Sequence, residues 1–175
     1  MVDDEKVIGK TVSSSLKLFG YKIFVADSVR EAIELLQINQ CDIVITDKNM
    51  PGLGGAKEGG LELLRYIKTN LPDTEVIIIT GFPSTESTVG AIKLGAFDYL
   101  TKPFSIKKLK EKIDRIVEYK NCIDQKNFLQ SYKNLHNEIA NLFARHDHLT
   151  CDEVRKSLKS IKTKIDFLSN TQKEF

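Results

Sequence analysis

Three stretches of the sequence could place reactive side chains at one edge of a sheet. Asp47 follows the β-branched run Ile43-Val44-Ile45, Thr80 ends the run 75–80, and Lys102 follows the run 97–101. Runs without polar alternation are typical of strands buried on both faces of a parallel sheet. Because parallel strands share one carboxyl edge, we expect these three side chains to meet there.

Asp3 and Asp4 follow Met1 and Val2, and we expect them at the same edge. Clustered carboxylates repel one another unless a cation joins them, and their hard oxygen atoms suit Mg²⁺. An aspartate bridged by a metal beside a lysine and a hydroxyl is a suitable acceptor for a phosphoryl group. Taken alone, Asp47 could equally cap the turn at 50–52, so its partners decide between the two interpretations.

The elements that must hold these residues alternate along the chain. The apolar spacing predicts helices near 5–19, 28–38, 60–70 and 84–94, and strands at 21–26, 42–46, 75–80 and 97–101. Strands that alternate with helices imply βαβ units with right-handed crossovers. We therefore expect a doubly wound α/β domain over residues 1–104.

The composition of the 175-residue chain limits the class of protein. Its formal net charge is +2, but residues 1–103 carry 11 Lys and Arg against 14 Asp and Glu, and residues 104–175 carry 15 against 10. The three cysteines, Cys41, Cys122 and Cys151, show no paired spacing, which argues against a disulfide framework or a zinc ribbon. No apolar run approaches the roughly 20 residues that span a bilayer. We expect a cytoplasmic protein with no membrane contact.

Four motifs occur in the order found in one family: Asp3-Asp4, Asp47 with Met50-Pro51, Thr80-Gly81, and the run 99–104, Tyr-Leu-Thr-Lys-Pro-Phe. Together they resemble the receiver domain of bacterial two-component response regulators, over roughly residues 1–118. The resemblance implies a flavodoxin-like, doubly wound parallel sheet of five strands. It also implies a phosphorylation-dependent signalling switch, and not a metabolic enzyme.

The same resemblance assigns roles to individual residues. Asp47 corresponds to the phospho-acceptor, Thr80 to the switch hydroxyl, Lys102 to the lysine that contacts the phosphate, and Tyr99 to the aromatic switch. The Mg²⁺ ligands it implies are Asp3, Asp4, Asp47 and the backbone carbonyl of Asn49. The implied partner is a sensor histidine kinase or a phosphotransfer protein.

Two departures from the family pattern carry expectations of their own. The apolar stretch before the acidic pair is reduced to Met1 and Val2, so we expect a truncated first strand and weakly held Mg²⁺ ligands. The helix after the acceptor loop starts about five residues late, which places an insertion within Leu53–Gly59 beside the site. That insertion is either a neutral surface loop or a glycine-hinged flap that controls access to Asp47.

The tail beyond residue 118 is predicted to be a second, helical module over residues 119–175. Two apolar stripes predict a helical hairpin or coiled coil, with a capping box at Thr150–Glu153 between them. The stripes are Phe128, Tyr132, Leu135, Ile139 and Leu142, followed by Val154, Leu158, Ile161, Ile165 and Leu168. Two hairpins could pair as a homodimeric four-helix bundle, because one hairpin buries little core.

Three further interpretations of the tail stay open. The tail carries an excess of basic residues and could contact DNA in a transcriptional regulator. No recognition-helix pattern is present, however, and we do not expect the tail to bind nucleic acid. His136 could serve as a phosphorelay site, although a partly exposed helix histidine is favoured. His146, His148 and Cys151 have metal-ligand chemistry at irregular spacing, so we do not expect a metal site there.

Overall fold

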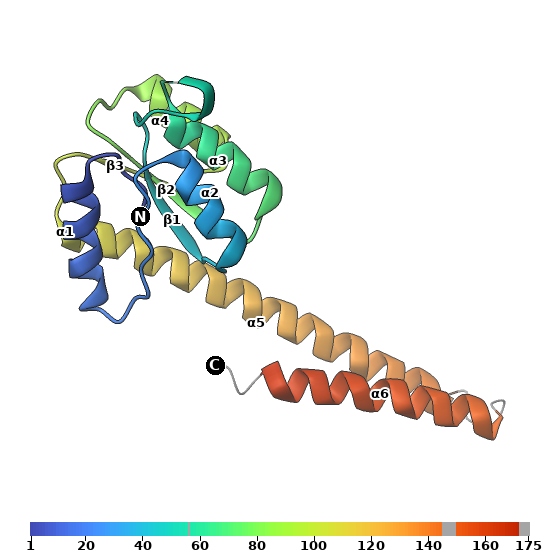
Figure 1. Cartoon of the computed structure of the whole chain (residues 1–175). Helices are drawn as coiled ribbons and strands as arrows, with labels where there is room; N and C mark the ends of the chain where they lie inside the picture. Colours follow the sequence, from blue (N-terminus) through green and yellow to red (C-terminus); the bar gives the residue numbers. More distant parts are fainter. Residues whose placement is uncertain (56, 145–149, 172–175) are drawn as a thin grey trace. The chain divides into compact units, whose positions relative to one another are not determined.

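The computed structural model describes residues 1–55, 57–144 and 150–171, and the chain divides into two compact units, Met1–Val117 and Glu118–Phe175. The first unit is a parallel sheet with helices packed on both faces, and the second is a pair of helices (Figure 1). The described residues contain no helix long and apolar enough to cross a membrane.

Three regular strands form the sheet in the order β1-β2-β3, and all pairs are parallel. They are β1 (Ile43–Asp47), β2 (Glu75–Thr80) and β3 (Asp98–Thr101). Asp47 pairs with Ile79, the residue before Thr80, and Thr80 pairs with Thr101, the residue before Lys102. The three reactive residues therefore lie at the same edge of the sheet. The expectation of a doubly wound parallel α/β fold is confirmed.

The first three residues complete the sheet as a short central segment. Val2 makes parallel bridges to both Ala26 and Thr46. Its amide donates to the Ile45 carbonyl at 2.8 Å, and the Asp47 amide donates to the Val2 carbonyl at 2.9 Å. Val2 is only 4% exposed, so even this short segment is fixed within the core. It delivers Asp3 to the carboxyl edge beside Asp47.

The prediction of a regular strand over 21–26 is wrong. The chain there is extended without a ladder, and only Ala26 forms a bridge. The physical reason is the shortness of its neighbour, since three residues offer hydrogen bonds only to Phe24 and Ala26. The sheet therefore has three regular strands and two bridged segments.

Helices cover the two faces of the sheet with two separate cores. The helices of the first unit are α1 (Lys6–Lys17), α2 (Val29–Ile38), α3 (Gly59–Asn70), α4 (Thr85–Lys93) and the start of α5 (Ile106–Ala144). In β2, Val76 and Ile78 pack into one core with residues of α2, α3 and α4, and Ile77 and Ile79 pack into the other with residues of α1 and α5. This alternation explains why the strand has no polar positions.

The second unit consists of the remainder of α5 and the helix α6 (Cys151–Thr171), which run side by side (Figure 1). The predicted capping box is present, because the Thr150 amide donates to Glu153 Oε2 and the Glu153 amide donates to Thr150 Oγ1. Leu135 and Ile161 are each 6% exposed, whereas Tyr132, Leu158 and Ile165 are 57%, 54% and 45% exposed. Each predicted stripe is therefore only partly covered within the hairpin.

Candidate functional site

The ends of the strands bring two carboxylates and one ammonium group together. Lys102 Nζ lies 2.8 Å from Asp47 Oδ1 and 2.9 Å from Asp3 Oδ2, and Glu5 Oε1 is 3.6 Å away. The Asp3 side chain is fully buried, and those of Asp47 and Lys102 are 8% and 17% exposed. Residues almost 100 positions apart in the sequence thus form one ion-paired cluster, as the sequence predicts.

The cluster holds more negative than positive charge. Burial raises the pKa of Asp3, and the hydrogen bond from Lys102 opposes that rise without cancelling it. Burial lowers the pKa of Lys102, but the carboxylates of Asp47 and Asp3 outweigh it and leave the pKa above its usual value. An enclosed group of two carboxylates and one ammonium has the charge balance of a cation-binding site.

Asn49 ties the acceptor loop to the switch hydroxyl. Its backbone amide donates to Asp47 Oδ2 at 2.7 Å, and its side-chain amide donates to Thr80 Oγ1 at 3.2 Å. The Phe82 amide donates to the same oxygen at 3.2 Å, and Thr80 is fully buried. Thr80 Oγ1 thus accepts two hydrogen bonds at the edge where Asp47 lies.

Tyr99 lies half-buried in the adjoining core and contacts the start of α4. Its hydroxyl is 3.2 Å from Ser87 Oγ. Ser87 Oγ also belongs to the capping box of α4, because it accepts from the Ser84 amide while Ser84 Oγ accepts from the Ser87 amide. The aromatic residue predicted to act as a switch is therefore hydrogen-bonded to the cap of a helix, a contact that sequence spacing does not predict.

The predicted Mg²⁺ ligands converge only in part. Asp3 and Asp47 converge, whereas Asp4 is exposed, and no cluster of three His, Cys, Asp or Glu residues occurs in the described ranges. Mg²⁺ in proteins typically keeps several waters and uses one or two carboxylates, so two buried carboxylates with an excess of negative charge fit its chemistry.

Sequence reasoning missed Lys48 and the role of the two glycines that start α3. Lys48 is 8% exposed, and its ammonium pairs with Glu58 Oε1 at 2.9 Å. A Cβ on Gly60 would lie 2.0 Å from the Asp47 carbonyl oxygen, and one on Gly59 would lie 2.7 Å from the Met50 carbonyl oxygen. The pair Gly59-Gly60 was the signal in the sequence, because two residues without side chains at the start of a helix let another part of the backbone approach closely.

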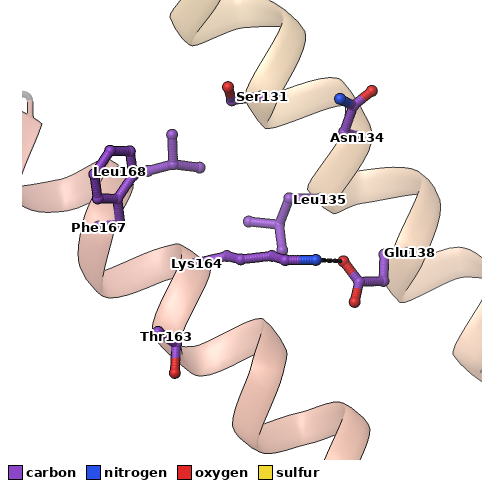
Figure 2. Close-up of a pocket in the computed structure, with 8 residues that line it drawn as sticks. All are labelled: Ser131, Asn134, Leu135, Glu138, Thr163, Lys164, Phe167 and Leu168. Carbon is purple, nitrogen blue, oxygen red and sulfur yellow. Dashed lines mark hydrogen bonds and ion pairs between the residues drawn. The ribbon is translucent and has the colours of Figure 1, made fainter.

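The remaining candidates lie in the second unit. His136 is exposed on α5, and His146 and His148 lie outside the described residues. A groove of about 460 Å³ lies between α5 and α6, crossed by the ion pair of Lys164 with Glu138 (Figure 2). Its apolar lining is Leu135, Phe167 and Leu168.

Comparison with known proteins agrees with this geometry. Residues 1–114 match the response regulator receiver domain family. The chain belongs to this family. Receiver domains are the signalling switches of two-component systems and are not classical enzymes.

Among the similar proteins, the response regulators FleR and PilR of Pseudomonas aeruginosa are 32% and 34% identical to this chain over 115 and 121 residues. These alignments cover 66% and 69% of this chain but only 23% and 26% of the relatives. The chain therefore spans about a quarter of the length of these larger regulators.

Two solved structures show the same fold. A receiver domain from Clostridium thermocellum is 33% identical, with a TM-score of 0.63, over 70% of this chain and 94% of its own. NtrX from Brucella abortus is 27% identical, with a TM-score of 0.65, over 81% of this chain and 33% of its own. The NtrX match covers a larger share of this chain than the matched receiver residues 1–114 do.

Proposed function

We propose that Asp47 accepts a phosphoryl group from the phosphohistidine of a sensor kinase or phosphotransfer protein. The observation that carries this proposal is the contact of Lys102 with both Asp47 and Asp3 at the carboxyl edge of the sheet. In the transfer, an Asp47 carboxylate oxygen bonds to phosphorus while the bond from phosphorus to the histidine nitrogen breaks. The nitrogen keeps the electron pair, and the ring leaves as neutral imidazole because its other nitrogen carries a proton.

The chain's own residues prepare Asp47 for this attack. The Asn49 amide holds Oδ2 at 2.7 Å and the Lys102 ammonium holds Oδ1 at 2.8 Å, so the acceptor has one fixed orientation. Fixed donors hold the carboxylate in the orientation for attack, so that it needs little rearrangement before the reaction. Phosphoryl uptake and loss at Asp47 are then weakly self-catalysed.

Mg²⁺ is the cofactor that we assign to this site, with Asp3, Asp47 and the Asn49 carbonyl as candidate ligands and Asp4 as a contributor from the exposed side. When bound, the ion neutralises charge on the phosphoryl oxygens. The structure supports Asp3 and Asp47 through their burial and convergence. Asp4 rests on sequence position alone.

Thr80 and Tyr99 form the proposed readout. Thr80 Oγ1 accepts from Asn49 and Phe82, and its own proton is suited to a phosphoryl oxygen on Asp47. If Thr80 turns toward that oxygen, Tyr99 can move into the space it leaves. Such a pair of states biases the face formed by α4, β3 and α5.

Phosphoryl incorporation measured by mass tests the proposal. The full chain is incubated with Mg²⁺ and a small-molecule phosphodonor, and compared with Asp47→Asn. We expect one phosphoryl group on the wild type and none on the variant. Equal incorporation in both, or none in the wild type, would contradict Asp47 as acceptor.

We further propose that residues 119–175 form a homodimerisation module next to a receiver domain of residues 1–118. The exposed stripe residues Tyr132, Leu158 and Ile165 support this proposal, because a second hairpin could cover them. Analytical ultracentrifugation tests it with Ile165→Lys, which is expected to shift a dimer to monomer. A wild-type monomer at all concentrations would exclude it.

A further inference from the structure

The loop from Pro51 to Glu58, which contains most of the insertion predicted within Leu53–Gly59, is closed at its base directly behind the acceptor residue. The chain leaves at Pro51, forms the short 3₁₀ turn η1 (Leu53–Gly55), and returns at Gly59. There the Gly59 amide donates to the Met50 carbonyl at 2.9 Å, and the Gly60 amide donates to the Lys48 carbonyl at 3.2 Å. The two ends of the loop are thus attached to the backbone that follows Asp47.

A single ion pair adds a side-chain link across this base. Lys48 directly follows Asp47 in the sequence, and its side chain is 10% exposed. Its ammonium lies 2.9 Å from the Glu58 carboxylate. Glu58 is the last loop residue before α3 and its side chain is 53% exposed. The cation is therefore enclosed, while the anion comes to it from the solvent side.

Lys48 connects through one peptide to the group that orients the acceptor. The Asn49 amide holds Asp47 Oδ2, and the Asn49 side chain holds Thr80 Oγ1. The Lys48 amide donates to the Ile79 carbonyl at 2.7 Å, which fixes the amino side of the residue. The Lys48–Asn49 peptide is therefore the covalent link between the ion pair with Glu58 and the two hydrogen bonds of Asn49.

We propose that Lys48 and Glu58 form a latch, in which Glu58 is a positioning residue: by pairing with the enclosed Lys48 ammonium it keeps that cation from displacing the Asn49 amide from Asp47, and so it sustains the rate of phosphoryl uptake. The inference rests on the proposed function of Asp47 and assigns to the inserted loop a role in that reaction. The loop supplies the anion that keeps an enclosed ammonium in place beside the acceptor.

The latch predicts an unequal effect of removing its two members. Glu58→Ala leaves the Lys48 ammonium enclosed without its partner, and it must turn toward water and displace the Asn49 peptide. Lys48→Met removes the need for a partner and leaves the backbone hydrogen bonds of Gly59 and Gly60 in place. Glu58→Ala should therefore be more harmful than Lys48→Met, and the double variant should behave like Lys48→Met.

The rate of phosphorylation by a small-molecule donor with Mg²⁺, measured against donor concentration, tests this order. We expect Glu58→Ala to lower the maximal rate at least about five-fold with an unchanged half-saturating donor concentration, because the acceptor is misplaced while donor contacts remain. Lys48→Met and the double variant should stay within about two-fold of each other and above Glu58→Ala. Glu62→Ala is the matched control, since it removes the hydrogen bond to the Leu53 amide in the same loop without touching Lys48.

A second measurement separates failure of the latch from failure of the proposed function. In an NMR spectrum of the backbone amides of the unphosphorylated chain, the chemical shift of the Asn49 amide should change in Glu58→Ala and stay unchanged in Glu62→Ala. If the wild type takes up no phosphate but Asn49 moves, the proposed function of Asp47 fails together with the effect of the latch on its rate, and only the positioning of Asn49 by Glu58 stands. If Glu58→Ala keeps the wild-type rate and the Asn49 resonance, the latch is overturned, whatever Asp47 accepts.

Discussion

Two ion-paired groups, one in each unit of the chain, hold their charged side chains in opposite ways. In the receiver unit, Lys102 contacts two carboxylates whose side chains are 0% and 8% exposed. In the helical unit, the pair of Lys164 with Glu138 has side chains 52% and 36% exposed. The buried cluster requires every partner, because an unpaired charge has no water to replace the lost contact. The exposed pair contributes little that water would not supply.

Gly60→Ala should have the largest effect and would sharpen this contrast, since it tests how tightly the receiver unit is packed behind Asp47. The added Cβ would meet the Asp47 carbonyl oxygen at 2.0 Å, and neither backbone can yield easily. We expect a loss of more than about 3 kcal/mol in the free energy of unfolding, measured by denaturant titration. Gly90→Ala on α4, with nothing within 4 Å, is the control and should be neutral or stabilising.

A pair of leucine truncations compares the two units directly. Leu64 is fully buried in the receiver core, whereas Leu158 on α6 is 54% exposed. Leu64→Ala should lower the free energy of unfolding by about 3 kcal/mol, and Leu158→Ala by less than about 0.5 kcal/mol at low protein concentration. A comparable loss for Leu158→Ala would break the comparison, and it would show that a partner covers α6.

Lys102→Met tests whether the acidic cluster depends on its cation. Removing the ammonium leaves Asp3 buried beside Asp47 without its partner, and we expect a loss of about 2–3 kcal/mol in the absence of Mg²⁺. Millimolar Mg²⁺ should recover part of that loss in thermal unfolding, and more than it stabilises the wild type. A variant that unfolds at the same temperature with and without Mg²⁺ would argue against a metal at Asp3 and Asp47.

Ser87→Ala should have the smallest effect among these changes in the receiver unit. It removes the contact with the Tyr99 hydroxyl and one half of the capping box of α4, worth about 1 kcal/mol. The wild type and Tyr99→Phe, compared in the same denaturant titration, separate the loss of the phenol contact from the loss of the cap. An unchanged free energy of unfolding in Ser87→Ala would show that this contact does not anchor Tyr99.

The sequence predicts the strand ends well, and the physical reason is local. A strand buried on both faces needs a continuous apolar run, so the positions of Asp47, Thr80 and Lys102 can be read from the residues before them. The helix starts at Ser28 and Ser84 are confirmed for a similar reason, since a side-chain cap is a local interaction.

Contacts between distant residues could not be predicted in this way. The segment 21–26 has strand-like residues, but its hydrogen bonds depend on the length of the neighbouring segment at Met1–Asp3. The pairing of Lys48 with Glu58 and of Ser87 with Tyr99 depends on how a loop or a helix packs. Side-chain spacing along the chain carries no information about either. The roles of Asp47, Thr80, Lys102, Tyr99 and the Mg²⁺ ligands remain predictions.

The burial of the cluster around Lys102 also determines how the protein should respond to ionic strength. Dissolved salt screens exposed charges over about 10 Å at 0.1 M, but it has little access to groups as enclosed as Asp3 and Asp47. The contact of Lys102 with the acceptor should therefore persist from dilute buffer to molar salt, while the pair of Lys164 with Glu138 weakens. A salt titration thus perturbs the surface of the helical unit and leaves the chemistry of the receiver unit almost unchanged.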